Sequence, residues 1–204
     1  MSRPDPGAVG ACLRRVPVTL VFLCLMLAAN ALAGTLSGHI DPELLANWGI
    51  GVEALKDGKL LRFVTAVFLS HDLSMALRQL VFAASVIGAV EWRFGSWRAA
   101  GLFFALDVTA TLVLLAAVAV LPVLATLAAT TDLGMSMGGF GLIGVLIGTR
   151  ARAGWWLAAV LALIGLKYAA SPDPLADLGH AIALVIGFSI QRSGLLGGEN
   201  PRRG

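Results

Sequence analysis

Apolar residues run along this chain in six long stretches, separated by short polar segments. The stretches fall at about residues 16–36, 64–90, 99–121, 135–149, 154–170 and 176–191. A helix needs about 20 predominantly apolar residues to cross the hydrocarbon core of a bilayer. The pattern therefore predicts six transmembrane helices, of which the fourth and the sixth are short. Short spans favour helices that begin below the membrane surface, with a wet pocket above them.

Composition favours the same fold and excludes an ordinary soluble domain. The 204 residues are 58% hydrophobic and only 13% charged, and the mean hydropathy is +0.86. A soluble domain carries about 25% charged residues, so this chain has too few polar residues to cover a globular surface. We expect an all-α membrane protein that lies in the lipid bilayer.

The basic residues lie in short runs between the apolar stretches and predict the orientation of the helices. One side of the membrane collects Arg3, Arg14, Arg15, Arg93, Arg98, Arg150, Arg152, Arg192, Arg202 and Arg203. The opposite side has only Lys56, Lys59, Arg62 and Lys167. By the positive-inside rule both termini are cytoplasmic, and we expect a bacterial cytoplasmic membrane. Short runs of this kind reflect topology, so no nucleic-acid partner is expected.

We divide the chain into a cytoplasmic segment (1–15), a six-helix membrane domain (16–191) and a disordered cytoplasmic tail (192–204) rich in glycine and charge. The first stretch could instead be a signal peptide cleaved after Ala33. Its length of about 21 residues suits a span better, which favours a retained helix. The long first external loop, which contains Trp48, is predicted to lie in the membrane interface.

Two charged residues, Arg78 and Asp107, fall inside consecutive spans, where burial of a charge is costly. Because these spans are antiparallel, we expect the two side chains to pair and to hold the helices together. A proton or ion pathway, as in a transporter or channel, is the alternative reading. Asp132, just before the fourth span, is expected to cap that helix.

Ser136 lies in the stretch GMSMGGFG, and either helix packing or chemistry would explain it. The fourth span has small residues at Gly134, Gly138, Gly141, Gly144 and Gly148, and the sixth has them at Gly179, Ala183 and Gly187. Small residues let helices approach closely. If these stripes meet, Ser136 and His180 lie at a similar outer depth. A serine in contact with a histidine can be an activated nucleophile, and a helix N-terminus offers N–H groups to an oxyanion.

The string Gly134-x-Ser136-x-Gly138 also matches the nucleophile elbow of α/β-hydrolases. That elbow requires a strand before the serine and a soluble sheet around it. Neither is predicted here, so we set this reading aside.

The order of these features resembles the rhomboid intramembrane protease family over about residues 45–190. An arginine, a threonine and a Phe-Leu pair lead into the second helix, at Arg62, Thr65, Phe68 and Leu69. A Gly-x-x-x-Glu-x-x-x-Gly turn is matched, with its first spacing one residue shorter, by Gly88, Glu91 and Gly95. The serine motif and the last-helix motif are matched by Gly134, Ser136, Phe140, Gly141, His180 and Gly187.

The resemblance implies a Ser-His dyad that cleaves transmembrane segments of other membrane proteins near their outer ends. Ser136 would attack the scissile carbonyl, and His180 would take its proton and pass it to the leaving amine. Phe140 would stack against the imidazole, and the backbone N–H of Ser136 would stabilise the oxyanion. No cofactor is implied. His39 and His71, with scattered carboxylates, do not have the spacing of a metal site.

Several positions depart from the family pattern and leave a second function open. Met137 follows the serine where the family has glycine, and Ala183 replaces a glycine after the histidine. Met75 and Gln79 stand where the family has a histidine and an asparagine as oxyanion donors. Gln79 can donate through its amide, but Met75 cannot. The alternative is therefore a catalytically impaired pseudoprotease that binds transmembrane segments and affects their folding, trafficking or turnover. His71, four residues before Met75, is expected to face elsewhere on the helix.

Overall fold

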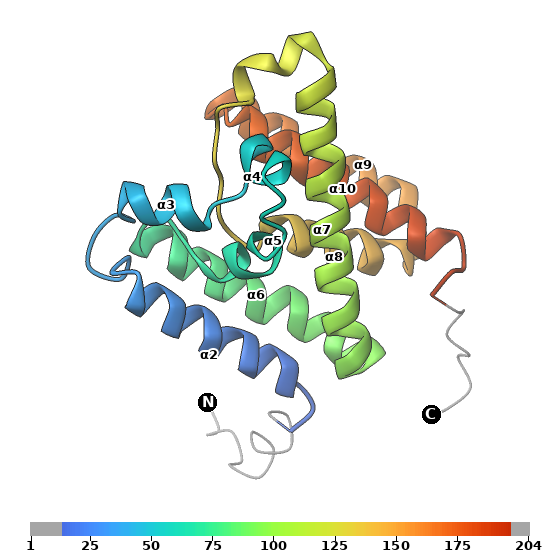
Figure 1. Ribbon diagram of the computed structural model, residues 1–204. Helices are drawn as coiled ribbons and strands as arrows, with labels where there is room; N and C mark the ends of the chain where they lie inside the picture. Colours follow the sequence, from blue (N-terminus) through green and yellow to red (C-terminus); the bar gives the residue numbers. More distant parts are fainter. Residues whose placement is uncertain (1–13, 197–204) are drawn as a thin grey trace.

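The computed structural model describes residues 14–196, and within them the chain is helical. Its long helices are α2 (Pro17–Leu32), α6 (Leu73–Phe94), α7 (Ser96–Val120), α8 (Ser136–Gly148), α9 (Ala153–Ala170) and α10 (Pro174–Arg192). Four of them, α6, α7, α9 and α10, are long and apolar enough to cross a membrane, while α2 and α8 are shorter apolar helices. The predicted all-α, six-helix membrane fold is confirmed (Figure 1). The predicted tail lies mostly outside the described residues.

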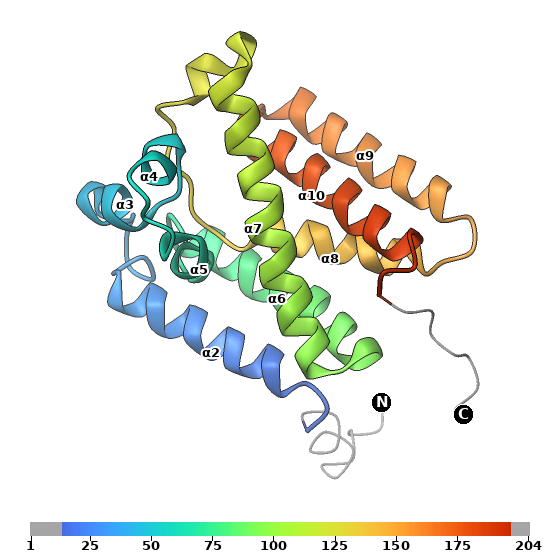
Figure 2. The same ribbon diagram turned by 45° about the vertical axis from the view of Figure 1, so that its right-hand side comes forward.

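Helix α8 lies at the centre of the bundle and contacts α6, α7, α9 and α10 (Figure 2). Its glycines make this position possible. A Cβ atom added at Gly144 would overlap the carbonyl oxygen of Leu184, and one added at Gly187 would overlap the backbone of Gly141. The backbones of α8 and α10 therefore touch, and the predicted packing of the two small-residue stripes is confirmed.

Helix α2 is joined to the bundle by a buried carboxylate on α6. Glu91 accepts hydrogen bonds from the backbone N–H groups of Val18 (2.8 Å) and Thr19 (2.7 Å) and from the Thr19 hydroxyl (2.7 Å). These N–H groups belong to the first turn of α2, where no intrahelical acceptor exists. Glu91 thus caps α2, and Phe22 and Met26 of that helix are buried in the core. Retention of the first helix stays a prediction.

The second span begins later than predicted. Hydropathy placed its start at residue 64, but α5 (Arg62–Thr65) and the 3-10 turn η1 (Ala66–Phe68) form a separate segment before α6. Asp72 ends this segment by capping α6, because its carboxylate accepts the N–H of Met75 at 2.8 Å. Phe63, Ala66 and Val67 of this segment are buried against protein, whereas Val64 is exposed.

The long first loop, between α2 and α6, contains two short helices, α3 (Pro42–Trp48) and α4 (Val52–Lys56). The Arg62 guanidinium donates to the carbonyl oxygens of Ala46 (2.9 Å) and Gly49 (3.2 Å), which holds the loop in place. The loop reaches the segment before α8 through Ile50, which exchanges two backbone hydrogen bonds of 2.8 Å with Asp132. A short turn, η2 (Pro122–Leu127), covers the same end of the bundle. The placement of this loop in the membrane interface stays a prediction.

The predicted pairing of Arg78 with Asp107 is wrong. Arg78 lies on the exposed side of α6 and donates to Ser74 one turn earlier, at 2.7 Å. Asp107 is 2% exposed, faces α8 and accepts the backbone N–H of Gly138 at 2.8 Å. Arg78 lies near the start of α6 and Asp107 near the middle of α7, so the two residues differ in depth, and their side chains also face different neighbours.

Candidate active site

Ser136 is the first residue of α8, and an irregular segment, not a strand, leads into it. In that segment the N–H of Gly134 donates to the carbonyl of Ala66 at 3.0 Å. Gly134 has a φ of +117°, which a residue with a side chain rarely adopts. A Cβ at this position would also overlap the amide of Gln79. Only glycine therefore allows the chain to turn into α8 at this point.

His180 lies beside the first turn of α8. Its imidazole stacks on the ring of Phe140, with centroids 4.2 Å apart and planes 17° apart, as the family resemblance implied. Phe140 is one helical turn after Ser136. The Nε2 atom of His180 is buried and has no hydrogen-bond partner among residues 14–196. The packing of α8 on α10 thus places His180 against Phe140, one turn after Ser136, and no hydrogen bond joins Ser136 to His180 among the described residues. Such bonds often form only when substrate is bound.

Met137 fills the space between α8 and the start of α10. Its thioether lies against Gly179, the residue before His180, where an added Cβ would overlap it. Leu114 and Leu175 complete the apolar surroundings of Met137. The bulky side chain that departs from the family pattern is therefore accommodated because residue 179 has no side chain.

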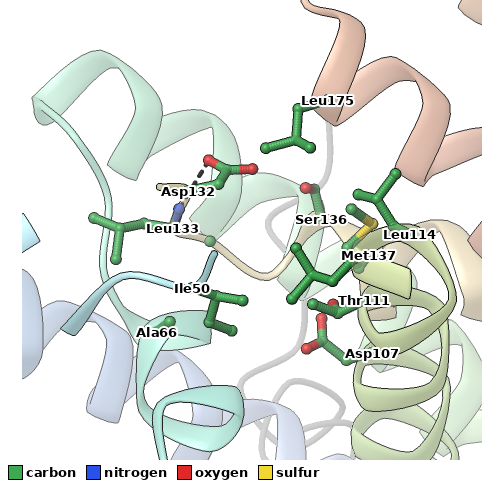
Figure 3. Close-up of a pocket in the computed structure, with 12 residues that line it drawn as sticks. Ile50, Ala66, Asp107, Thr111, Leu114, Asp132, Leu133, Ser136, Met137 and Leu175 are labelled. Carbon is green, nitrogen blue, oxygen red and sulfur yellow. Dashed lines mark hydrogen bonds between the residues drawn. The ribbon is translucent and has the colours of Figure 1, made fainter. Parts of the chain in front are cut away.

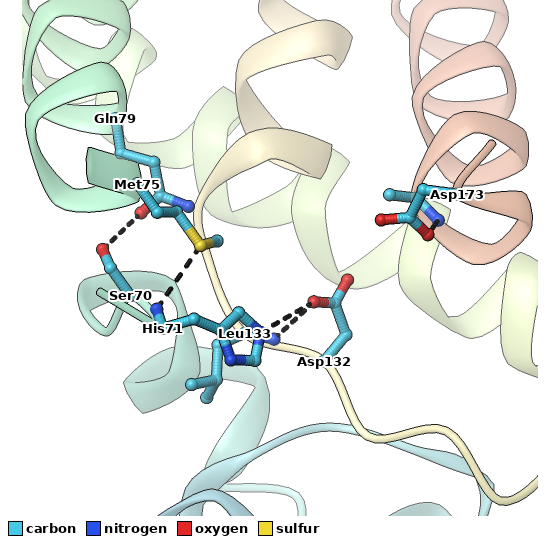
Figure 4. A network of polar contacts seen from close by, with 8 residues as sticks. Ser70, His71, Met75, Gln79, Asp132, Leu133 and Asp173 are labelled. Carbon is cyan, nitrogen blue, oxygen red and sulfur yellow. Dashed lines mark hydrogen bonds and ion pairs between the residues drawn. The ribbon is translucent and has the colours of Figure 1, made fainter. Parts of the chain in front are cut away.

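Gln79 is the polar side chain that α6 presents to the segment before Ser136 (Figure 4). The Ser70 hydroxyl donates to Oε1 of Gln79 at 3.0 Å, so the amide nitrogen faces Gly134. Met75, one turn earlier, offers no donor, and its sulfur accepts the N–H of His71 at 3.4 Å. Gln79 is thus placed and oriented as a donor, and Met75 is not.

Two sequence-based expectations about the neighbouring loops are wrong. His71 precedes α6 instead of lying on it, and its Nε2 is 3.7 Å from Oδ1 of Asp132 (Figure 4). Asp132 does not cap α8, because its carboxylate accepts the N–H of Leu133 at 2.8 Å and faces His71. The neighbouring carboxylate of Asp132 raises the pKa of His71 above its usual 6.5. No sequence signal links these residues, which are 61 positions apart.

The side chain that caps α8 is Asp107, which comes from α7. Its Oδ1 accepts the N–H of Gly138, in the first turn of α8, at 2.8 Å. N–H groups in a first helical turn have no intrahelical acceptor, and the N-terminal end of a helix favours negative charge. This role was missed in the sequence because the donor and the acceptor lie on different helices.

A family model described as "Rhomboid-like protein" matches residues 11–195, which is nearly the whole chain. The chain belongs to the rhomboid-like proteins. No curated protein matches it. Membership of this family agrees with the all-α membrane bundle that the structure shows.

The site of this rhomboid-like protein contains a cavity of about 30 Å³ next to Ser136 (Figure 3). Its polar lining comes from α7 (Asp107, Thr111), from Ser136 and from Asp132. Ile50 of the first loop and Leu175 at the start of α10 also line the cavity. A space of this size holds one or two water molecules. Ser136 is therefore accessible to a small polar molecule although apolar helices surround it.

Proposed function

We propose that this rhomboid-like membrane protein is an intramembrane serine protease that cleaves transmembrane segments of other membrane proteins. The observation that carries the proposal is the place of His180, stacked on Phe140 one turn from Ser136, with Nε2 free of any partner among the described residues. A structural histidine in an apolar bundle would normally satisfy its buried nitrogen with a hydrogen bond. A general base must keep that nitrogen free for the proton that it takes.

In the proposed reaction Ser136 Oγ attacks the scissile carbonyl carbon as its proton passes to Nε2 of His180. The imidazolium then protonates the amine as the carbon–nitrogen bond breaks, which leaves an acyl group on Ser136. The N–H of Ser136 and the amide of Gln79 supply hydrogen bonds to the oxyanion. The loop helices α3 and α4 and the outer ends of α6 to α9 shape the entry of the substrate.

A second candidate function rests on the degraded donor side of the site. Met75 contributes no donor, and one first-turn N–H of α8, that of Gly138, is already bonded to Asp107. Removing one oxyanion donor costs about a hundred- to a thousandfold in rate in other enzymes. A rhomboid-like pseudoprotease with the same fold would bind transmembrane segments without cutting them and so affect their folding, trafficking or turnover.

Labelling of the purified protein with a fluorophosphonate probe separates the two functions. We expect the wild-type protein to be labelled, and Ser136→Ala and His180→Ala to lose the label. Ser85→Ala is the matched serine control, because that hydroxyl lies on the exposed side of α6 and donates to the carbonyl of Val81. His39→Ala, in the first loop, is the matched histidine control.

Labelling of the wild type and of both controls, but of neither Ser136→Ala nor His180→Ala, would support an assembled dyad. Absence of labelling in a folded wild-type protein would refute the protease function and favour the pseudoprotease. We also propose that the site opens to the outer side of the membrane. The same labelling on intact cells, with probes that do and do not cross the membrane, tests this orientation.

A further inference from the structure

The C-terminal end of α9 is joined to α10 by an ion pair in which one partner is buried. Helix α9 lies along α10 (Figure 2). Lys167 Nζ is 3.0 Å from Oδ2 of Asp177, and Asp177 is only 5% exposed whereas the Lys167 side chain is 49% exposed. A buried carboxylate is costly unless it is paired and hydrogen-bonded. The cation from α9 therefore offsets the cost of burying Asp177.

The apolar packing of α9 ends before this pair. The side chains of α9 that pack in a cluster with Ile147 of α8 and Leu184 of α10 are Leu157, Val160, Leu161 and Ile164. Every residue from 165 to 170 is exposed. Within residues 14–196, the side-chain hydrogen bond that joins this end of α9 to α10 is the one from Lys167 to Asp177.

Asp177 also organises the first turn of α10. Its Oδ2 accepts the backbone N–H of Asp173 at 3.1 Å, and the Asp173 carboxylate in turn accepts the N–H of Ala176 at 3.2 Å. This reciprocal cap fixes the direction in which the chain enters the helix. One oxygen of Asp177 thus joins the last turn of α9, the connection between the two helices and the start of α10.

His180 is close to this start of α10. It follows Asp177 by three residues, so the two side chains are neighbours on the surface of the helix. Helix α10 begins at Pro174, about two turns before His180. The imidazole keeps its place by stacking on Phe140 of α8, with ring centroids 4.2 Å apart. A change in the direction of the first turn of α10 would therefore move the imidazole relative to α8.

We propose that Lys167 and Asp177 are positioning residues, which hold the start of α10 so that Nε2 of His180 can take the proton of Ser136. The proposal rests on the protease function above. It goes beyond it because it gives α9 a part in catalysis, although α9 carries neither member of the dyad. In this role Lys167 and Asp177 do not contact the reacting atoms. They act through the turn of α10 that separates Asp177 from His180.

Two other accounts of this ion pair predict different results. If the pair only stabilises the bundle, its loss lowers the unfolding temperature but leaves Ser136 equally reactive in the molecules that stay folded. If the pair only governs how a transmembrane substrate reaches the site, a small probe reacts with Ser136 at the wild-type rate. A positioning role is the account in which a small probe reacts more slowly although the protein is folded.

The variants separate the charges of the pair from the cap of α10. Lys167→Met removes the cation and keeps a long side chain, and Lys167→Arg keeps the charge. Asp177→Asn removes the negative charge, while its amide oxygen can still accept the N–H of Asp173. Lys59→Met is the matched control, because Lys59 forms an ion pair of 2.9 Å with Asp57 in the first loop, where both side chains are about half exposed.

The experiment measures the rate of fluorophosphonate labelling of the purified full chain at a temperature at which every variant is folded. We expect Lys167→Met and Asp177→Asn to be labelled about tenfold more slowly than the wild type, less than the hundredfold that a displacement of about 1 Å costs. Lys167→Arg should recover most of the rate, and Lys59→Met should be labelled like the wild type. Because both residues act through one contact, the double variant should be no slower than either single variant.

A second measurement reports the place of His180 whether or not the protein cleaves. In NMR spectra of histidine-labelled protein, the ring current of Phe140 shifts the imidazole proton signals of His180 to high field, and His180→Ala identifies these signals. We expect Lys167→Met to move them toward the positions of an unstacked imidazole and Lys167→Arg to restore them. The signals of His39, in the first loop, are the internal control.

Labelling of Lys167→Met at the wild-type rate, or His180 signals that do not move in this variant, would overturn the proposal. Equal slowing of Lys59→Met would also overturn it, because the loss of any ion pair would then slow the reaction. If the folded wild type is not labelled, the protease function fails and the catalytic role of the pair fails with it. A shift of the His180 signals in Lys167→Met would then still show that the pair positions this histidine.

Discussion

The contact between the α8 and α10 backbones at Gly144 makes a quantitative test of how the site is assembled. In Gly144→Ala the new methyl group would overlap the carbonyl oxygen of Leu184 and lie 2.6 Å from the nitrogen of Phe188. Ordinary contacts of this kind begin at 3.4 Å. Because both neighbours are backbone atoms, no side chain can rotate away. The contact with the nitrogen of Phe188 alone requires the two helices to separate by about 0.8 Å at this crossing.

Two effects on stability oppose each other in Gly144→Ala. Overpacking of this kind lowers the free energy of unfolding by about 1–3 kcal/mol. The higher helix propensity of alanine raises it by about 1 kcal/mol. We therefore expect a net loss of about 0–2 kcal/mol in the free energy of unfolding. The effect on activity is larger, because His180 lies one turn from the contact and a shift of about 1 Å in a reacting group costs up to about a hundredfold in rate.

The assay compares the rate of fluorophosphonate labelling with the thermal unfolding of the same samples in detergent. We expect labelling of Gly144→Ala to fall about ten- to a hundredfold while the protein remains folded. Gly165→Ala on α9 is the matched control, because its added methyl group meets no atom within 4 Å. It should label at the wild-type rate and unfold no earlier. If Gly144→Ala labels and unfolds like the wild type, the two backbones are not in the contact described above.

Three further predictions test single contacts. Gln79→Ala should lower the cleavage rate about a hundred- to a thousandfold through loss of an oxyanion donor while thermal unfolding changes little; unchanged cleavage would remove Gln79 from the mechanism. Glu91→Ala should cost about 2–6 kcal/mol, because two first-turn N–H groups of α2 lose their acceptor, and Glu91→Gln should cost less in the same unfolding assay. His71, whose pKa is raised mainly by the neighbouring Asp132 carboxylate, stabilises the fold fully below pH 6.5 and less as the pH rises through its raised pKa. The unfolding temperature of the wild type should therefore fall as the pH rises from about 6.5 through the raised pKa of His71, and it should stay nearly level in His71→Gln. Parallel profiles would show that the pair does not form in solution.

The hydrophobic pattern was sufficient to predict the number and order of the helices. Each stretch is so apolar that it is expected in lipid, where a helix satisfies its own backbone hydrogen bonds. The glycine stripes also predicted which helices touch, because small residues at a spacing of four make one flat face on a helix. The type and order of the polar residues gave the family resemblance, and with it the pairing of Phe140 with His180 that the structure contains.

The start of α6 was predicted wrongly for a reason that applies to hydropathy in general. Residues Phe63, Ala66 and Val67 are apolar and almost fully buried, but protein surrounds them. A hydropathy value describes how strongly a side chain avoids water. Burial in the interior of a protein removes the side chain from water as effectively as burial in lipid does. Only the cap by Asp72 and the contacts of α5 and η1 with the bundle distinguish the two environments.

The partners of the polar residues were decided by tertiary structure alone. The sequence by itself determined that Arg78 and Asp107 lie within spans, and that Ser136 and His180 lie at helix ends of similar depth. Which way each side chain points depends on the rotation of its helix and on the angle at which helices cross, and a few tens of degrees exchange one neighbour for another. That rotation gives Asp107 the N–H of Gly138 instead of Arg78, and it brings Thr111 to the cavity beside the serine.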